Sequence, residues 1–145
     1  NVRINGQAWP SSIACEATLT WAHRDRITQA DQIIPHSAGN IGPEPGVTYT
    51  VRWYDEHGVL RRTHNGIAGT SQVWSTESSD CGGRWQGRIT ARVESVRSGT
   101  ASHQYVEVTT KRIGYGLNWG ELWGGASGLS CVGMPVSYVY GDSMV

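Results

Sequence analysis

Hydrophobic and polar residues alternate along much of the chain between Ala14 and Lys111. This period of two is typical of β-strands that bury one face. The segments that share it are 17–23, 47–55, 59–64, 70–76, 87–96 and 102–111. These short strands have no helical window between them, so the pattern predicts an all-β fold, an antiparallel β-sandwich.

Turn-forming residues separate the predicted strands. The strongest signal is Asn65-Gly66, because this dipeptide favours tight turns between strands. Residues 56–58 and 97–99 also predict turns, and 78–83 predicts a loop. The segment 59–64 carries two arginines and is therefore expected at the edge of a sheet.

One face of each strand is expected to form the core. Trp21 alternates with Leu19, and large aromatic residues on such a face usually pack inside. The predicted core residues are Leu19, Trp21, Tyr49, Val51, Trp53, Ile89 and Val93.

A long insertion at 24–46 interrupts the strand pattern. It is polar, contains prolines and ends in a turn-rich stretch, so we expect a loop that is functional or forms an interface. A short helix over 27–34 is the alternative. Arg24 and Arg26 either lie at a solvated strand end or bind carboxylates of a neighbouring subunit.

The segment after the last strand combines glycines with large rings. Tyr115, Trp119 and Trp123 recur every four residues in GYGLNWGELWGG, and the glycines argue against a helix. Rings outside a core normally have a partner, because their exposure to water is costly. The segment therefore contacts neighbouring subunits, folds back on its own sandwich, or stacks on sugar rings.

Residues 135–141 also alternate, with Tyr138 and Tyr140 on one face. We expect this segment to be able to add a strand to a sheet edge of another chain. The predicted division is thus an N-terminal arm at 1–13, a sandwich at 14–111 with the 24–46 insertion, and a C-terminal assembly segment at 112–145.

The amino-acid composition limits the functions that we expect of this chain. Lys plus Arg and Asp plus Glu each number 12, so the net charge is zero. This balance offers no electrostatic basis for binding nucleic acid, and it suits a subunit that associates. No apolar run is long enough for a membrane-spanning helix. The chain opens without a signal peptide or an initiator methionine, and we expect it to be a piece of a longer polypeptide.

Catalytic and metal-binding motifs are absent from the sequence. The five histidines have no metal-ligand spacing, and the stretch 128–133 misses the G-x-S-x-G pattern of a serine nucleophile. The adjacent Asp55 and Glu56 are expected in a turn, where acids are usually solvated. The sequence therefore predicts no catalytic residue, no metal ligand and no cofactor.

The three cysteines, Cys15, Cys81 and Cys131, form no disulfide framework. We expect free thiols in a protein assembled in a reducing cytoplasm. A disulfide between Cys81 and Cys131 is the alternative. Trp85 lies in a glycine-rich stretch and is a candidate exposed platform.

Several strands resemble the fibronectin type III family. The residues LTW at 19–21 are similar to its second strand, and 48–58 looks like its third. The stretch 87–110 resembles its last hairpin, with Ser95-Val96, Gly99 and Ser102 following the family pattern one residue shorter. The insertion at 24–46 and Ile89, where the family usually has Tyr, depart from that pattern.

The combination of these segments with glycine-aromatic repeats resembles fibronectin-like segments of tailed-bacteriophage tail and tail-tip proteins. That resemblance implies a structural role in the virion without catalysis, and assembly in the host cytoplasm. Its expected partners are other tail subunits, in a homo-oligomer such as a trimer, and a host-surface receptor. The alternative function is an adhesin module that binds carbohydrate or a receptor through Trp85 or Trp119.

Overall fold

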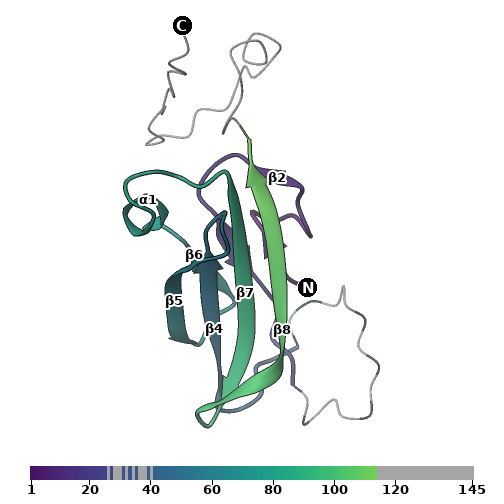
Figure 1. Cartoon of the computed structure of the whole chain (residues 1–145). Coiled ribbons are helices and arrows are strands. Elements are labelled where there is room, and N and C mark those ends of the chain that lie inside the picture. The colour runs from purple at the N-terminus through teal and green to yellow at the C-terminus, as the bar shows by residue number, and fades with distance from the viewer. Residues whose placement is uncertain are drawn as a thin grey trace, which may run out of the picture.

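The structure, a computed structural model, is a β-sandwich of two sheets (Figure 1). It describes residues 1–25, 27, 31, 33, 35, 39 and 41–113. The smaller sheet has the order β1 (Arg3–Ile4), β3 (Thr18–Thr20), β6 (Ser71–Val73). The larger sheet has the order β2 (Ser12–Ile13), β8 (Thr100–Arg112), β7 (Arg88–Arg97), β4 (Val47–Tyr54), β5 (Leu60–Ile67). This confirms the expected all-β sandwich.

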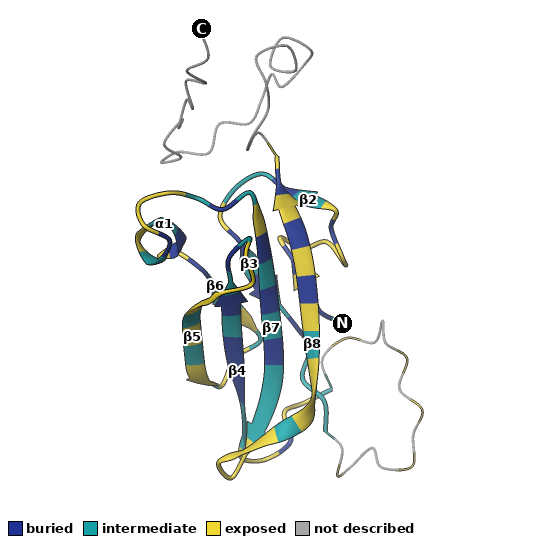
Figure 2. Ribbon diagram, viewed as in Figure 1, coloured by how far each residue is buried: buried dark blue, intermediate teal, exposed yellow. Residues whose placement is uncertain are grey.

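Alternation along the long strands places the core between the sheets. On β4, Tyr49, Val51 and Trp53 are buried, whereas Arg52 and Tyr54 between and after them are partly exposed. In Figure 2, buried residues alternate with intermediate ones along β7 and with exposed ones along the last part of β8. All seven predicted core residues are buried: Leu19, Trp21, Tyr49, Val51, Trp53, Ile89 and Val93.

The first thirteen residues contribute a strand to each sheet. β1 pairs with β3 in the smaller sheet, whereas β2 runs parallel to the end of β8 in the larger one. Asn5 supports the turn after β1, because its side chain bonds the backbone of Glu16 and Thr18 at 3.1 and 2.8 Å. The expected N-terminal arm therefore crosses from one sheet to the other.

The predicted turn at Asn65-Gly66 is wrong, because both residues lie inside β5. The pairing of Tyr49 with Ile67 and of Val51 with His64 leaves these two residues opposite the single Thr50. Gly66 has φ +68°, a backbone conformation that glycine adopts without strain. The dipeptide thus forms a β-bulge within the strand rather than a turn between strands.

The predicted loop at 78–83 contains most of one helical turn, α1 (Glu77–Asp80). Asp80 anchors this turn: its carboxylate accepts bonds from Trp74 Nε1 at 2.8 Å and Thr76 Oγ1 at 2.7 Å. It also forms an ion pair with Arg62 of β5. These bonds hold α1 against the edge of the larger sheet.

Candidate functional site: a groove beside the free edge of β8

Among the strands of the described residues, β8 has a neighbour on only one side for most of its length. β7 pairs with it from Thr100 to Lys111, whereas β2 pairs only with Lys111 and Arg112. Figure 1 shows β2 beside the last part of β8 alone. Within the described residues, the edge of β8 before Thr110 therefore has no strand beside it.

The hydrogen bonds at the end of β8 indicate which backbone groups face this edge. Lys111 N and Ile113 N donate to Ser11 O and Ile13 O at 3.2 and 2.8 Å, away from β7. Arg112 N donates in the opposite direction, to Gly87 O at 2.9 Å. Because successive residues of a strand alternate, the amides of Thr109, Glu107 and Tyr105 face the free edge.

A groove of about 520 Å³ opens between the two sheets next to this edge. Its apolar lining comes from both sides of the core: Trp21, Val47, Tyr49, Val93 and Val106. Polar residues surround it, among them Ser102, His103 and Gln104 of β8 and Glu44. Residues 5–11 cross between the sheets, and no strand of the described residues fills the space beside the first half of β8.

Trp21, one of the rings that line the groove, carries an unsatisfied donor. Trp21 is only 7% exposed, and its indole Nε1 has no hydrogen-bond partner among the described residues. Its ring packs against Tyr49, with centroids 5.3 Å apart, and Tyr49 Oη lies 3.1 Å from His23 Nδ1. A buried donor without a partner costs about 1–3 kcal/mol, so an acceptor entering the groove would be stabilised there.

One wall of the groove is fixed by an ion pair. Glu44, 2% exposed, accepts a bond of 2.6 Å from Arg97 Nη1 at the end of β7. Glu44 O also accepts a bond from Val47 N at 3.1 Å, where β4 begins. The end of the 24–46 insertion is thereby attached to the larger sheet.

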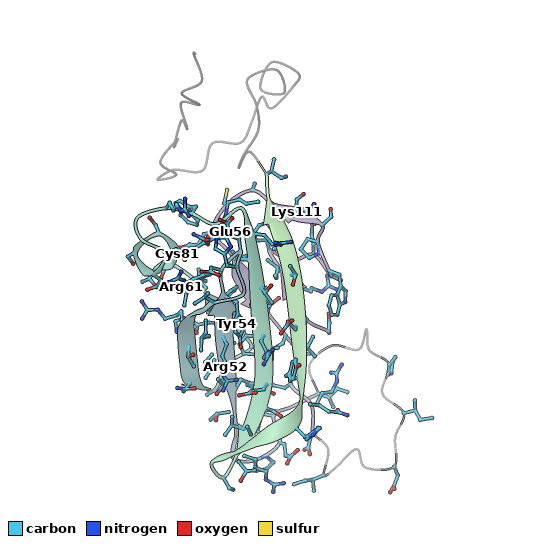
Figure 3. All side chains as sticks on the ribbon, viewed as in Figure 1. Arg52, Tyr54, Glu56, Arg61, Cys81 and Lys111 are labelled. Carbon is cyan, nitrogen blue, oxygen red and sulfur yellow. The ribbon has the colours of Figure 1, made fainter. Side chains whose placement is uncertain are left out.

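The outer face of the larger sheet carries a network of paired charges. Arg92 donates two bonds to Glu107, at 2.9 and 2.7 Å, and its guanidinium lies 4.0 Å from the centroid of Tyr105. Arg52 forms a second ion pair with Glu94. Arg52 and Tyr54, labelled in Figure 3, lie on this face of β4. Because these charges neutralise one another, the face offers little net attraction for a charged partner.

A buried ion pair closes the opposite end of the sandwich. Arg112, at the end of β8, donates to Glu77 Oε2 at 2.6 Å, and both side chains are almost fully buried. Arg112 also donates to the carbonyls of Gln86 and Cys15. Burial raises the pKa of Glu77 and lowers that of Arg112, while the pairing opposes both shifts. The pair ties α1, the loop before β7 and the residues after β2 to the last strand.

The structure describes two cysteines: Cys81 is a free thiol, and Cys15 forms a disulfide. Burial raises the pKa of the Cys81 thiol to about 11, so it stays protonated at neutral pH and is a poor nucleophile. Cys15 is disulfide-bonded, and its partner lies outside the described residues. The expectation of free thiols throughout is therefore wrong for Cys15.

The predicted interface residues fall in different places. Arg24 Nη1 donates to the carbonyls of His23 and Gly39 at 3.2 and 2.7 Å, which ties the start of the insertion to Gly39. Trp85 is half-buried, with the Arg112 guanidinium 4.6 Å from its ring centroid, and is no free platform. The others lie outside the described residues: Arg26, Tyr115, Trp119, Trp123, Tyr138 and Tyr140.

Arg112 and Glu77 were missed by the sequence reasoning. A signal for Arg112 exists, since Val106, Val108 and Thr110 share the inward face of β8 and the same period reaches Arg112. No comparable signal marks Glu77, because it lies in a single helical turn.

No group of His, Cys, Asp or Glu that could hold a metal ion occurs among the described residues. In the same part of the chain, no helix is long and apolar enough to cross a membrane. Comparison with known protein families and with characterised proteins gave no match.

Proposed function

We propose that this chain is a non-catalytic assembly module, a fibronectin type III-like sandwich of a bacteriophage tail or tail tip. The observation that carries the proposal is the apolar groove beside the free edge of β8. An unpaired strand edge next to an apolar opening is a surface on which another chain can add a strand. An assembly module needs such a surface, whereas an isolated sandwich normally covers it.

The proposed family rests on the resemblance of several segments of the sequence to fibronectin type III domains. The segments 48–58 and 87–110 fall on β4 and on the β7–β8 hairpin, which are neighbours in one sheet. Leu19 and Thr20 lie across the core on β3, and Trp21, directly after this strand, packs against Tyr49. Segments that resemble one fold in order thus also pack together, which supports a sandwich of that kind.

The chemistry of the described residues also favours packing over catalysis. The buried charged side chains among the described residues are all paired: Glu77 with Arg112, Glu44 with Arg97, and Asp55 with Arg61. The buried thiol of Cys81 is held protonated by its raised pKa. These groups stabilise the sandwich, and the module is proposed to act by self-association with its neighbours in the tail.

The test is the oligomeric state of the full chain. We expect light scattering after size-exclusion chromatography to show an oligomer in the absence of any glycan. The paired substitution Trp119→Ser and Trp123→Ser should shift the chain towards monomer with little change in its melting temperature. A monomeric chain that binds a glycan array would instead favour the adhesin function.

A further inference from the structure

α1 is attached to β5 by the ion pair of Asp80 with Arg62, and His64 lies on the same face of β5 as Arg62. We propose that these three residues form a pH-sensitive contact: a neutral His64 is compatible with the ion pair, and protonation of His64 loosens α1 from β5. The inference goes beyond the proposed function, because it concerns the sandwich itself and holds for a monomer as well as for an assembly.

His64 lies on the core face of an edge strand. It pairs with Val51, and Arg62 pairs with Trp53, so both β5 side chains share the face of the buried residues of β4. Val51 and Trp53 bring no charge to this face. The charged groups next to His64 are therefore Arg62, on its own strand, and Asp80 of α1.

The buried end of the His64 imidazole has no hydrogen-bond partner. Nε2 is closed off from solvent and meets no donor or acceptor among the described residues. In a neutral ring this nitrogen can remain an unprotonated acceptor, whereas protonation places an N–H on both ring nitrogens. A buried charged N–H without an acceptor is strongly unfavourable, so the present geometry suits the neutral ring alone.

The neighbouring carboxylate is already in use. Asp80 accepts bonds from Arg62 Nε at 2.9 Å, Trp74 Nε1 at 2.8 Å and Thr76 Oγ1 at 2.7 Å. A protonated His64 would have to reach water or take Asp80 from these donors. Either change weakens the attachment of α1, because the same bonds hold the helical turn in place.

The electrostatics act in the same direction. Burial lowers the pKa of His64 from 6.5 and Arg62 lowers it further, while Asp80 opposes both effects. The closed state thus binds the proton less readily than the open state, in which the imidazole is solvated. The closed contact is therefore favoured above about pH 6.5 and weakens as the pH falls below that value.

The other titratable groups of α1 behave differently. The pKa of Asp80 is about 2, so it stays ionised in mild acid, and the Cys81 thiol, with a pKa of about 11, stays protonated. Glu77 has a raised pKa, but it is bound to Arg112 of β8 rather than to β5. An effect in mild acid can thus arise from His64 or from Glu77, and a substitution at position 64 separates the two.

Hydrogen exchange of the α1 amides, followed by NMR on the full chain, tests the contact. The amides of Asp80, Cys81 and Gly83 donate to carbonyls of residues 76–78, so their exchange requires the turn to open. After correction for the intrinsic pH dependence of exchange, we expect their protection to fall by up to about 30-fold between about pH 7.5 and pH 5. The amides of β7 that pair with β4 are the internal reference and should keep their protection.

Two histidine variants assign the effect. His64→Gln cannot take up the proton, and we expect its α1 amides to be equally protected at both pH values. His57→Gln is the matched control, since the His57 side chain is 70% exposed, and it should show the same fall as the original chain. If His64→Gln does not fold, an NMR titration of the original chain replaces it: the His64 ring and the α1 amides should shift with one common midpoint below pH 6.5.

Three results would overturn the proposal. The first is α1 protection in the original chain that does not change with pH. The second is an equal fall in His64→Gln, or separate midpoints in the titration, which would assign the effect to Glu77. The third is a loss of protection in β7 by the same factor as in α1, because the chain would then unfold as a whole. None of these results bears on the assembly function, which the oligomeric state tests.

Discussion

Arg112 makes more structural contacts than its place at the end of a strand suggests. Its guanidinium lies against the Trp85 ring and binds Glu77 and two backbone carbonyls. Because the pair is buried, each charge depends on the other for compensation. A single residue thus connects four segments that are distant in sequence.

Arg112→Met should therefore destabilise the fold by about 3–5 kcal/mol, since it leaves the Glu77 charge buried and unpaired. Adding Glu77→Leu to that variant should restore much of the lost stability, because apolar packing then replaces the ion pair. Urea unfolding followed by tryptophan fluorescence measures the unfolding free energies of the single and the double variant. If Arg112→Met alone is as stable as the original chain, the Glu77–Arg112 pair contributes little to the unfolding free energy.

Asp80 predicts a stability change in acid. The hydrogen bond from Arg62 lowers its pKa from the ordinary 3.8 to about 2, helped by Trp74 and Thr76 and opposed by burial. A carboxyl whose pKa falls on folding stabilises the fold above its unfolded pKa, and this contribution is lost as the pH drops towards the folded value. The difference in unfolding free energy between the original chain and Asp80→Asn should therefore shrink between about pH 4 and pH 2. A difference that stays constant over this range would contradict the assignment.

At the scale of elements, the bulge in β5 depends on one glycine. Gly66→Ala should cost about 1 kcal/mol, because φ +68° is unfavourable for a residue with a Cβ. Gly69→Ala is the matched control, since Gly69 has no positive φ and equally open surroundings. Denaturant unfolding compares the two, and equal stabilities would mean that the strand relaxes around the bulge.

The strands also show what the sequence could predict. Alternation placed Tyr49, Val51 and Trp53 in the core because β4 is long enough for a period of two to be visible. β1 and β2 have two residues each, too few for any period, so their membership of the sheets could not be predicted. The turn predicted at Asn65-Gly66 is wrong because a glycine with positive φ occurs in β-bulges as well as in turns.

The groove could not be predicted, although its walls could. Trp21, Tyr49 and Val93 were expected in the core, and they are buried. The groove opens to the surface because residues 5–11 cross between the sheets and because β2 pairs only with the last two residues of β8. Both are long-range pairings that local patterns do not encode.

At the scale of the whole molecule, every strand of the described sandwich ends before Gly114. The eight strands of the described residues and both members of the Glu77–Arg112 pair precede this point. Deletion of 114–145 should therefore leave the fold intact and abolish self-association, because the deleted rings supply the proposed interface. Circular dichroism and light scattering on the same sample measure the two properties.

The disulfide of Cys15 provides the control for that deletion. Its partner lies outside the described residues, so removing 114–145 can release a thiol as well as an interface. Cys15→Ser in the full-length chain removes the disulfide alone, and we expect this variant to keep its oligomeric state while losing some thermal stability. If the deletion melts or aggregates while the full chain is monomeric, the segment belongs to the core of its own domain. The free edge of β8 would then be covered within one chain, and the assembly function would be wrong.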